Sequence, residues 1–178
     1  MKKIYTVLDL ETTGLTIQRN GITEIAAVKF DGKRILNRFQ TLIHPGRIIP
    51  KGIERLTWIT NEMVEDAPKI AEVIPEFKKF LWDDPIVGHN VRFDFWFLDF
   101  YSYKITWEHL ENELICTMKL ARKLLPDLEN KKLCTVCEYF GVINDQAHRA
   151  MSDTLATAEV FQHFLEEFPE EMEELLEY

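Results

Sequence analysis

Three stretches rich in apolar and β-branched residues open the chain, and each ends at residues typical of turns. The first covers Ile4–Leu15, with a Thr-Thr-Gly sequence near its end. The second covers Thr23–Phe30 and meets an Asp-Gly turn, and the third covers residues 34–44 and meets Pro45-Gly46. Short apolar runs bounded in this way predict strands, and an Asp-Gly turn between two of them predicts a hairpin. The chain is therefore expected to open with three antiparallel strands.

Helical spacing of the apolar residues takes over after Pro68. Apolar side chains at positions 70, 73, 74, 77, 80 and 81 recur every three or four residues, which predicts an amphipathic helix. The other expected elements are short helices and turns over 51–66, a buried strand over 86–88, helices over 91–103, 116–125 and 132–140, and a long helix from Met151. Strands followed by alternating helices and strands predict an α/β fold, in which helices flank a mixed sheet.

Length and composition limit the class of protein. The 178 residues are 46% hydrophobic and 29% charged, which fits one compact domain with a substantial core. We expect this domain to span residues 1–165, followed by an acidic extension over 166–178. The chain has three cysteines and no apolar run of membrane-spanning length, so we expect a reducing, cytoplasmic location and no membrane partner. The oligomeric state is left open.

The net charge of −9 is distributed unevenly along the chain. Residues 166–178 hold seven acids and no Lys or Arg, and the rest of the chain has 23 acids against 21 bases. Most of the chain is therefore close to neutral. This balance favours a short electrostatic contact with nucleic acid over a long basic groove.

Two acids, Asp9 and Glu11, lie at the C-terminal end of the first apolar strand, directly before its turn. Residues two apart in a strand point to the same face, roughly 6.6 Å apart along the chain. Two carboxylates so close repel each other unless a proton or a cation lies between them. Hard oxygen ligands favour Mg²⁺ or Mn²⁺. Paired acids are more often solvated surface, but a pair that ends an apolar strand indicates a metal site.

A second acid site is predicted where the short strand over 86–88 passes into a helix. The sequence there is Gly88-His89-Asn90-Val91-Arg92-Phe93-Asp94. Asp94 falls in the first helical turn, where the helix dipole and free amides stabilise an acid for structural reasons alone. Local sequence therefore leaves both a functional and a structural role open for Asp94.

A third site combines His148 and Asp153. A spacing of five places two helical residues about 140° apart, so the pair does not share a helix face. We expect His148 in the loop before the final helix and Asp153 inside that helix. A histidine in a loop is suited to accepting a proton near neutral pH, and the alternative is a surface His beside a helix-start Asp.

Together the three segments resemble one family. Asp9-x-Glu11, Asp94 in His-Asn-x-x-Phe-Asp, and His148-x4-Asp153 are similar in order and spacing to the acids of the DEDDh exonucleases, the DnaQ-like proofreading family. The similarity covers nearly the whole chain. Within the family, the chain looks most like the proofreading exonucleases of bacterial replicative DNA polymerases, the epsilon and PolC types of the polymerase III group.

The resemblance implies a ribonuclease-H-like fold and 3′→5′ hydrolysis of DNA to nucleoside 5′-monophosphates. It also implies two divalent metal ions, Mg²⁺ or Mn²⁺, which clamp the attacking and leaving oxygens. Asp9, Glu11, Asp94 and Asp153 are the implied ligands, and His148 is the implied base that takes a proton from the attacking water. The implied partners are single-stranded or frayed 3′ ends of DNA and a DNA polymerase.

A pocket for the terminal nucleotide follows from the same resemblance. Backbone amides around Thr12, Thr13 and Gly14 are expected to hold the nucleotide, with Leu15 against its base. The other expected contacts are Leu56, Thr57, Asn90 and Phe93. Stacking and backbone contacts of this kind tolerate any base, which suits proofreading. Core packing is an equal expectation for Leu15 and Phe93.

Two alternatives stay open. An RNA-trimming 3′→5′ exonuclease would use the same site, because nothing in the sequence fixes recognition of a 2′-hydroxyl. A non-catalytic metal-binding or polymerase-docking module would need none of the catalytic residues, so their presence together favours an enzyme.

Overall fold

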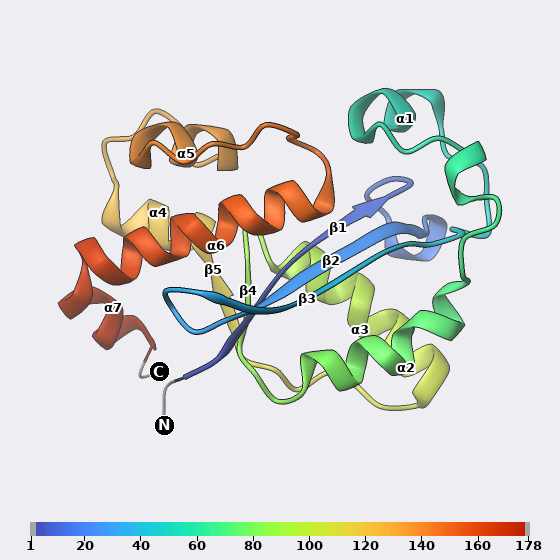
Figure 1. The fold of residues 1–178 in the computed structure, drawn as a ribbon, viewed down its shortest axis with the longest axis horizontal. Helices are drawn as coiled ribbons and strands as arrows, with labels where there is room; N and C mark the ends of the chain where they lie inside the picture. Colours follow the sequence, from blue (N-terminus) through green and yellow to red (C-terminus); the bar gives the residue numbers. More distant parts are fainter. Residues whose placement is uncertain (1–2, 177–178) are drawn as a thin grey trace.

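The computed structural model describes residues 3–176, which fold around a five-stranded mixed sheet (Figure 1). The strands are β1 (Tyr5–Thr12), β2 (Ile22–Phe30), β3 (Ile35–Leu42), β4 (Ile86–Gly88) and β5 (Leu114–Cys116), and they lie in the order β3-β2-β1-β4-β5. The central strand, β1, pairs antiparallel with β2 and parallel with β4. The prediction of a mixed sheet that opens with three antiparallel strands is confirmed.

Helices cover both faces of the sheet. One face carries α2 (Ile70–Leu81) and α3 (Arg92–Thr106), and α6 (Ala150–Glu167) crosses the other (Figure 1). The remaining helical segments are η1 (Ile17–Arg19), α1 (Lys51–Thr57), η2 (Glu62–Val64), α4 (Thr117–Leu124), α5 (Leu133–Phe140) and α7 (Pro169–Leu176). None of the helices in the described part of the chain is long and apolar enough to span a membrane.

Side-chain alternation along β1 gives each face of the sheet its own core. Tyr5 and Val7 belong to the core beneath α6, whereas Leu8 and Leu10 belong to the core beneath α2 and α3. Because successive side chains of a strand point to opposite faces, Asp9 shares the face of Tyr5 and Val7. The first apolar strand therefore delivers its acids to the face that α6 covers.

Two regions differ in detail from the sequence predictions. The apolar pattern predicts a helix from residue 116 with no strand before it, whereas the structure has the three-residue strand β5 directly before α4. The final long helix continues to Glu167, across the expected domain boundary at 165, and α7 follows it.

The acidic extension packs on the domain through α7. Met172 is 1% exposed and lies in the core that α6 covers. The acidic side chains of α7 are exposed, whereas Met172 faces inward and Leu175 and Leu176 pack partly buried against the same core, which is how a short amphipathic helix attaches to a domain. Residues 1–2 of the predicted domain and 177–178 of the predicted extension lie outside the described residues.

Candidate active site

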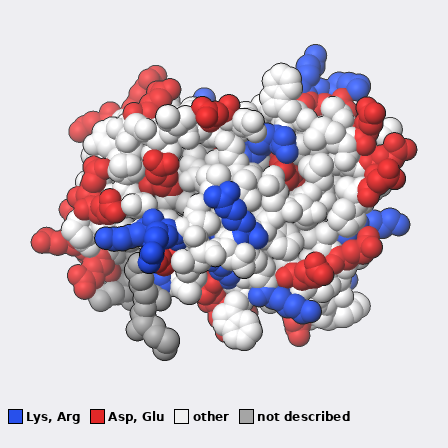
Figure 2. All heavy atoms as spheres, viewed as in Figure 1, with Lys and Arg blue, Asp and Glu red and all other residues white. Residues whose placement is uncertain are grey.

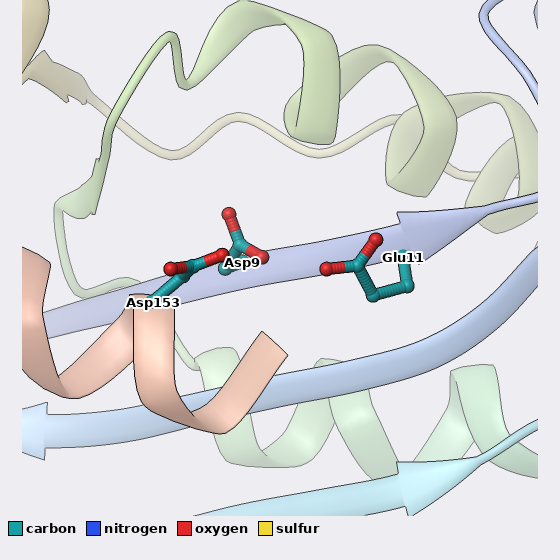
Figure 3. Close-up of side chains that lie close together, drawn as sticks. All are labelled: Asp9, Glu11 and Asp153. Carbon is teal, nitrogen blue, oxygen red and sulfur yellow. The ribbon is translucent and has the colours of Figure 1, made fainter. Parts of the chain in front are cut away.

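Three carboxylates meet at the C-terminal end of β1 (Figure 3). Asp9 and Glu11 come from one face of β1, and Asp153 comes from the first turn of α6. One oxygen of each residue lies within 4.8 Å of the others. The fold thus brings together acids from the two ends of the chain.

The loop before α6 sets the orientation of the Asp153 carboxylate. The side-chain amide of Asn144 donates a hydrogen bond to Oδ1 at 2.6 Å, and the backbone amide of His148 donates to Oδ2 at 2.9 Å. His148 has a backbone φ of 65°, in the left-handed region, and its side chain is exposed. The backbone of His148 therefore holds one ligand candidate while its imidazole stays accessible.

Asp94 approaches β1 from the first turn of α3. Its Oδ1 accepts a hydrogen bond from the backbone amide of Leu10 at 3.1 Å, and the residue is 4% exposed. Leu10 lies between Asp9 and Glu11, so this bond ties α3 to the strand at the acidic site. Among the described residues, Asp94 is a neighbour of the three-carboxylate cluster rather than a member of it.

Burial and mutual repulsion raise the pKa values of these acids. Burial, followed by the charge of Asp153, raises the pKa of Glu11 to about 8. Burial also raises the pKa of Asp94 to about 8, and burial together with Asp94 and Glu11 raises the pKa of Asp9 well above its ordinary range. Protons or a cation must therefore neutralise the cluster near neutral pH. Converging hard oxygen ligands fit a divalent metal ion.

Glu24 is a further buried acid beside the cluster, and it lies opposite Glu11 in the register of β1 and β2. The Nε and Nη2 atoms of Arg149 donate to its two carboxylate oxygens at 3.2 and 3.1 Å. The side chain of Gln40 donates at 2.9 Å and the backbone amide of Ala150 at 3.1 Å. Glu24 is therefore fully partnered within the protein.

These bonds attach the N-terminal end of α6 to the sheet. Arg149 precedes α6 directly, and Asp153 lies one turn further along, so Glu24 anchors the end of the helix that carries Asp153. Sequence reasoning missed this role of Glu24 and Arg149. The available signal was an acid within an otherwise apolar strand, since such an acid needs a buried partner.

Comparison with known proteins assigns the chain to a family. The exonuclease family named for RNase T matches residues 6–161. The chain belongs to this RNase T, or DnaQ-like, exonuclease family. It is 40% identical over 163 residues to DNA polymerase III subunit epsilon of Aquifex aeolicus, covering 92% of this chain and 81% of that protein. It is also 38% identical over 170 residues to the PolC-type DNA polymerase III of Bacillus subtilis, covering 95% of this chain but only 12% of that much longer protein.

Solved structures agree with the family assignment. Exonuclease X, in complex with 5′-overhanging duplex DNA, is 30% identical with a TM-score of 0.74, and the match covers 93% of each chain. Exonuclease I has a TM-score of 0.86 over 98% of this chain and 43% of its own, and its 20% identity makes it a match of fold. The predicted ribonuclease-H-like fold is confirmed. The chain is a 3′→5′ exonuclease, a phosphodiester hydrolase homologous to the proofreading exonucleases of DNA polymerase III.

The loop of this exonuclease after β1 is tied by its own hydrogen bonds. The Thr13 amide donates to the Gly21 carbonyl at 2.9 Å, so this amide, one of those expected to hold the nucleotide, already has a partner within the protein. The Thr12 hydroxyl donates to the Gly14 carbonyl at 2.8 Å. Gly14 has a backbone φ of 157°, which residues with a side chain rarely adopt, and a Cβ there would approach Asn20 Oδ1 to 2.6 Å, so the loop favours glycine at this position.

The other expected substrate contacts form two groups, one exposed and one buried or half-buried. Leu15 is 84% exposed and Leu56 is 47% exposed, and Asn90 is also exposed, so all three are accessible to a ligand. Thr57 is buried, and its hydroxyl donates to a backbone carbonyl one helical turn earlier. Phe93 is half-buried and packs in the core beneath α2 and α3. The exonuclease therefore offers the first three side chains more readily than the last two.

Proposed function

We propose that this exonuclease removes nucleotides from the 3′ end of a DNA strand, releases nucleoside 5′-monophosphates, and proofreads for a replicative DNA polymerase. The observation that carries the proposal is the cluster of Asp9, Glu11 and Asp153, whose oxygens lie within 4.8 Å of one another. The 40% identity that extends over 81% of a polymerase III epsilon subunit supports the proofreading role and a polymerase partner.

Two divalent ions, Mg²⁺ or Mn²⁺, are the proposed cofactors. Asp9, Glu11 and Asp153 would hold one ion, and Asp9 together with Asp94 would hold the other. Such ions, when bound, would neutralise the negative charge of the phosphodiester and lower the pKa of water. The three-carboxylate cluster fits this role because its carboxylates repel one another and a bound cation would offset that repulsion.

The protein's own groups would orient the site and move the proton. Asn144 and the His148 amide hold the Asp153 carboxylate in place. The exposed His148 side chain lines the same cavity as Asp153. An imidazole at this position accepts the proton of the attacking water, and its exposure lets it return the proton to solvent.

Accessible side chains next to the loop after β1 would receive the terminal nucleotide. Leu15 and Leu56 offer exposed apolar surface to a base. Apolar contact and stacking do not select among bases. A proofreading enzyme requires this tolerance of any base. Asn90 adds an exposed polar group near the start of α3.

The test compares 3′-labelled DNA and RNA strands, single or annealed with matched and mismatched 3′ ends, in Mg²⁺ and in Mn²⁺. We expect DNA to be degraded to 5′-monophosphates, and faster at mismatched ends because unpairing costs least where the pair is already wrong. Preferential degradation of RNA would make RNA trimming the function. Equal rates on matched and mismatched ends would count against proofreading, and hydrolysis of neither strand would overturn the proposal.

A further inference from the structure

Acidic residues outnumber basic ones in this chain. Figure 2 shows one face, on which Asp and Glu lie along much of the margin and Lys and Arg form separate small patches. The whole chain carries 30 acids against 21 bases. A strand of nucleic acid therefore needs a local site where positive charge is concentrated.

A cavity of about 790 Å³ beside the carboxylate cluster provides such a site. Asp153 and His148 line one part of it, and Arg122, Lys131 and Lys132 line another. Asp153 is the sole acid among the described residues that line it. The cavity thus combines three cationic side chains with direct access to the site of hydrolysis.

The segment that carries Lys131 is held firmly at the edge of this cavity. The Nε2 atom of His89 lies 2.8 Å from the Lys131 carbonyl, and Nδ1 lies 2.9 Å from the Thr117 hydroxyl. Burial lowers the pKa of His89, so the neutral ring donates to the carbonyl from Nε2 and accepts from the hydroxyl at Nδ1. The Lys131 ammonium donates to the Leu128 carbonyl at 2.6 Å and so braces the same segment.

The side chains of Arg122 and Lys132 do not brace the protein in this way. Arg122 and Lys132 are exposed, and neither forms an ion pair within the described part of the chain. Arg122 makes only a long contact from Nη2 to the Met118 sulfur, at 3.7 Å. Their positive charges are therefore available to a ligand that enters the cavity.

We propose that this cavity binds the sugar–phosphate backbone of the substrate strand on the 5′ side of the scissile bond, with Arg122 and Lys132 on its phosphates. The inference rests on the proposed function. In Figure 1, α4 and α5 lie on one side of the start of α6, and α1 with its exposed Leu56 lies on the other. The terminal nucleotide occupies the α1 side, so the rest of the strand leaves along the α4 and α5 side.

The experiment measures kcat and KM on two substrates. One is a short oligothymidylate, which has phosphates on the 5′ side of the scissile bond, and the other is the p-nitrophenyl ester of thymidine 5′-monophosphate, which has none. The test variant is Arg122→Gln/Lys132→Gln. The matched control is Lys119→Gln/Lys123→Gln, which removes two charges from exposed residues of α4 that do not line the cavity.

For the test variant, we expect a higher KM for the oligonucleotide. We also expect a smaller preference for it, measured as kcat/KM for the oligonucleotide divided by kcat/KM for the ester. Each phosphate contact on a single strand contributes about 0.7 to the slope of log affinity against log salt, so two contacts contribute roughly 1.4. Raising salt from about 50 to 200 mM therefore weakens wild-type binding by roughly sevenfold through these two contacts, and the variant loses this factor.

The control variant should keep the wild-type preference and most of the salt dependence. An unchanged preference in the test variant, or an equal loss in the control, would overturn the proposal. An equal loss on both substrates in the test variant would also overturn it, because that result indicates damage to the cluster. Failure of the wild-type protein to hydrolyse either substrate would instead contradict the proposed function.

Discussion

Glu11 and Glu24 lie opposite each other on β1 and β2, yet their carboxylates have opposite electrostatic surroundings. Glu24 is fully buried and receives donors from Arg149, Gln40 and the Ala150 amide. Glu11 has acidic neighbours, and burial with their repulsion raises its pKa to about 8. Arg149 neutralises Glu24 within the protein, whereas Glu11 remains able to bind a cation from solution.

Under the proposed function, this difference separates a structural acid, Glu24, from a metal-binding acid, Glu11. An internal guanidinium compensates the cost of burying Glu24 and ties α6 to the sheet at the same time. A cluster of acids without an internal cation destabilises the empty protein, and a bound divalent ion reverses that cost. Predictions that remove each acid in turn test this distinction.

Asp9→Asn should give the largest effect, a loss of hydrolysis of roughly 10³-fold or more, because the carboxylate is central to the proposed metal site. The unfolding temperature in EDTA should hold or rise, since one repelling charge is removed. Single-turnover hydrolysis and thermal unfolding check the two parts. Asp66→Asn, at an exposed acid, is the matched control, and an active or unfolded Asp9→Asn protein would contradict the assignment.

His148→Ala should slow hydrolysis by roughly 10²- to 10⁴-fold while leaving measurable turnover, because it removes proton transfer but no carboxylate. The backbone amide that holds Asp153 is retained. Calorimetry with Mn²⁺ should show little change in binding. His109→Ala, at an exposed histidine of the loop after α3, is the control, and weak Mn²⁺ binding by the His148 variant would mean that His148 is a ligand or a structural residue.

Glu24→Gln should lower the free energy of unfolding by about 3 kcal/mol, because Arg149 then lies partly buried without its anion. Urea unfolding measures the loss, and Glu76→Gln on the exposed face of α2 is the control. The double variant Glu24→Gln/Arg149→Gln should recover most of the lost stability. If the single variant is as stable as wild type, the internal ion pair does not anchor α6.

The last prediction concerns the pH dependence of the stability of the metal-free protein. The pKa of Glu11 rises from 4.5 to about 8 on folding, so folding favours its protonated form. Stability should therefore decline as pH increases from about 4.5 to about 8, and Mn²⁺ should reduce the decline. Thermal unfolding in EDTA and in Mn²⁺ across this range measures it. Glu11→Gln should flatten the EDTA curve, and a flat wild-type curve would argue against the uncompensated cluster.

Local patterns predict most of this fold because the residues involved act through near neighbours. The apolar spacing over 70–81 matches α2 at both ends, and the run before Gly88 matches β4. The pattern does not reveal β5, which has three residues and gains its strand geometry only by pairing with β4. The register that places Glu11 opposite Glu24 is likewise a property of two paired strands.

The candidate site is predictable only where its residues form compact motifs. Asp9 and Glu11 share a strand face, and His148 and Asp153 lie within one short segment, so their spacing carries information. The pairing of Glu24 with Arg149 joins residues that are 125 positions apart, and no local pattern encodes it. The braced Lys131 segment depends in the same way on His89, 42 positions earlier.

The carboxylate cluster also has a consequence for the order in which the protein is made. Asp9 and Glu11 emerge from the ribosome with the first strand, whereas Asp153 emerges only with α6. The same helix closes one face of the sheet with Phe161 and Phe164, both fully buried. A growing chain therefore cannot assemble the three-carboxylate cluster until its last long helix docks on the sheet.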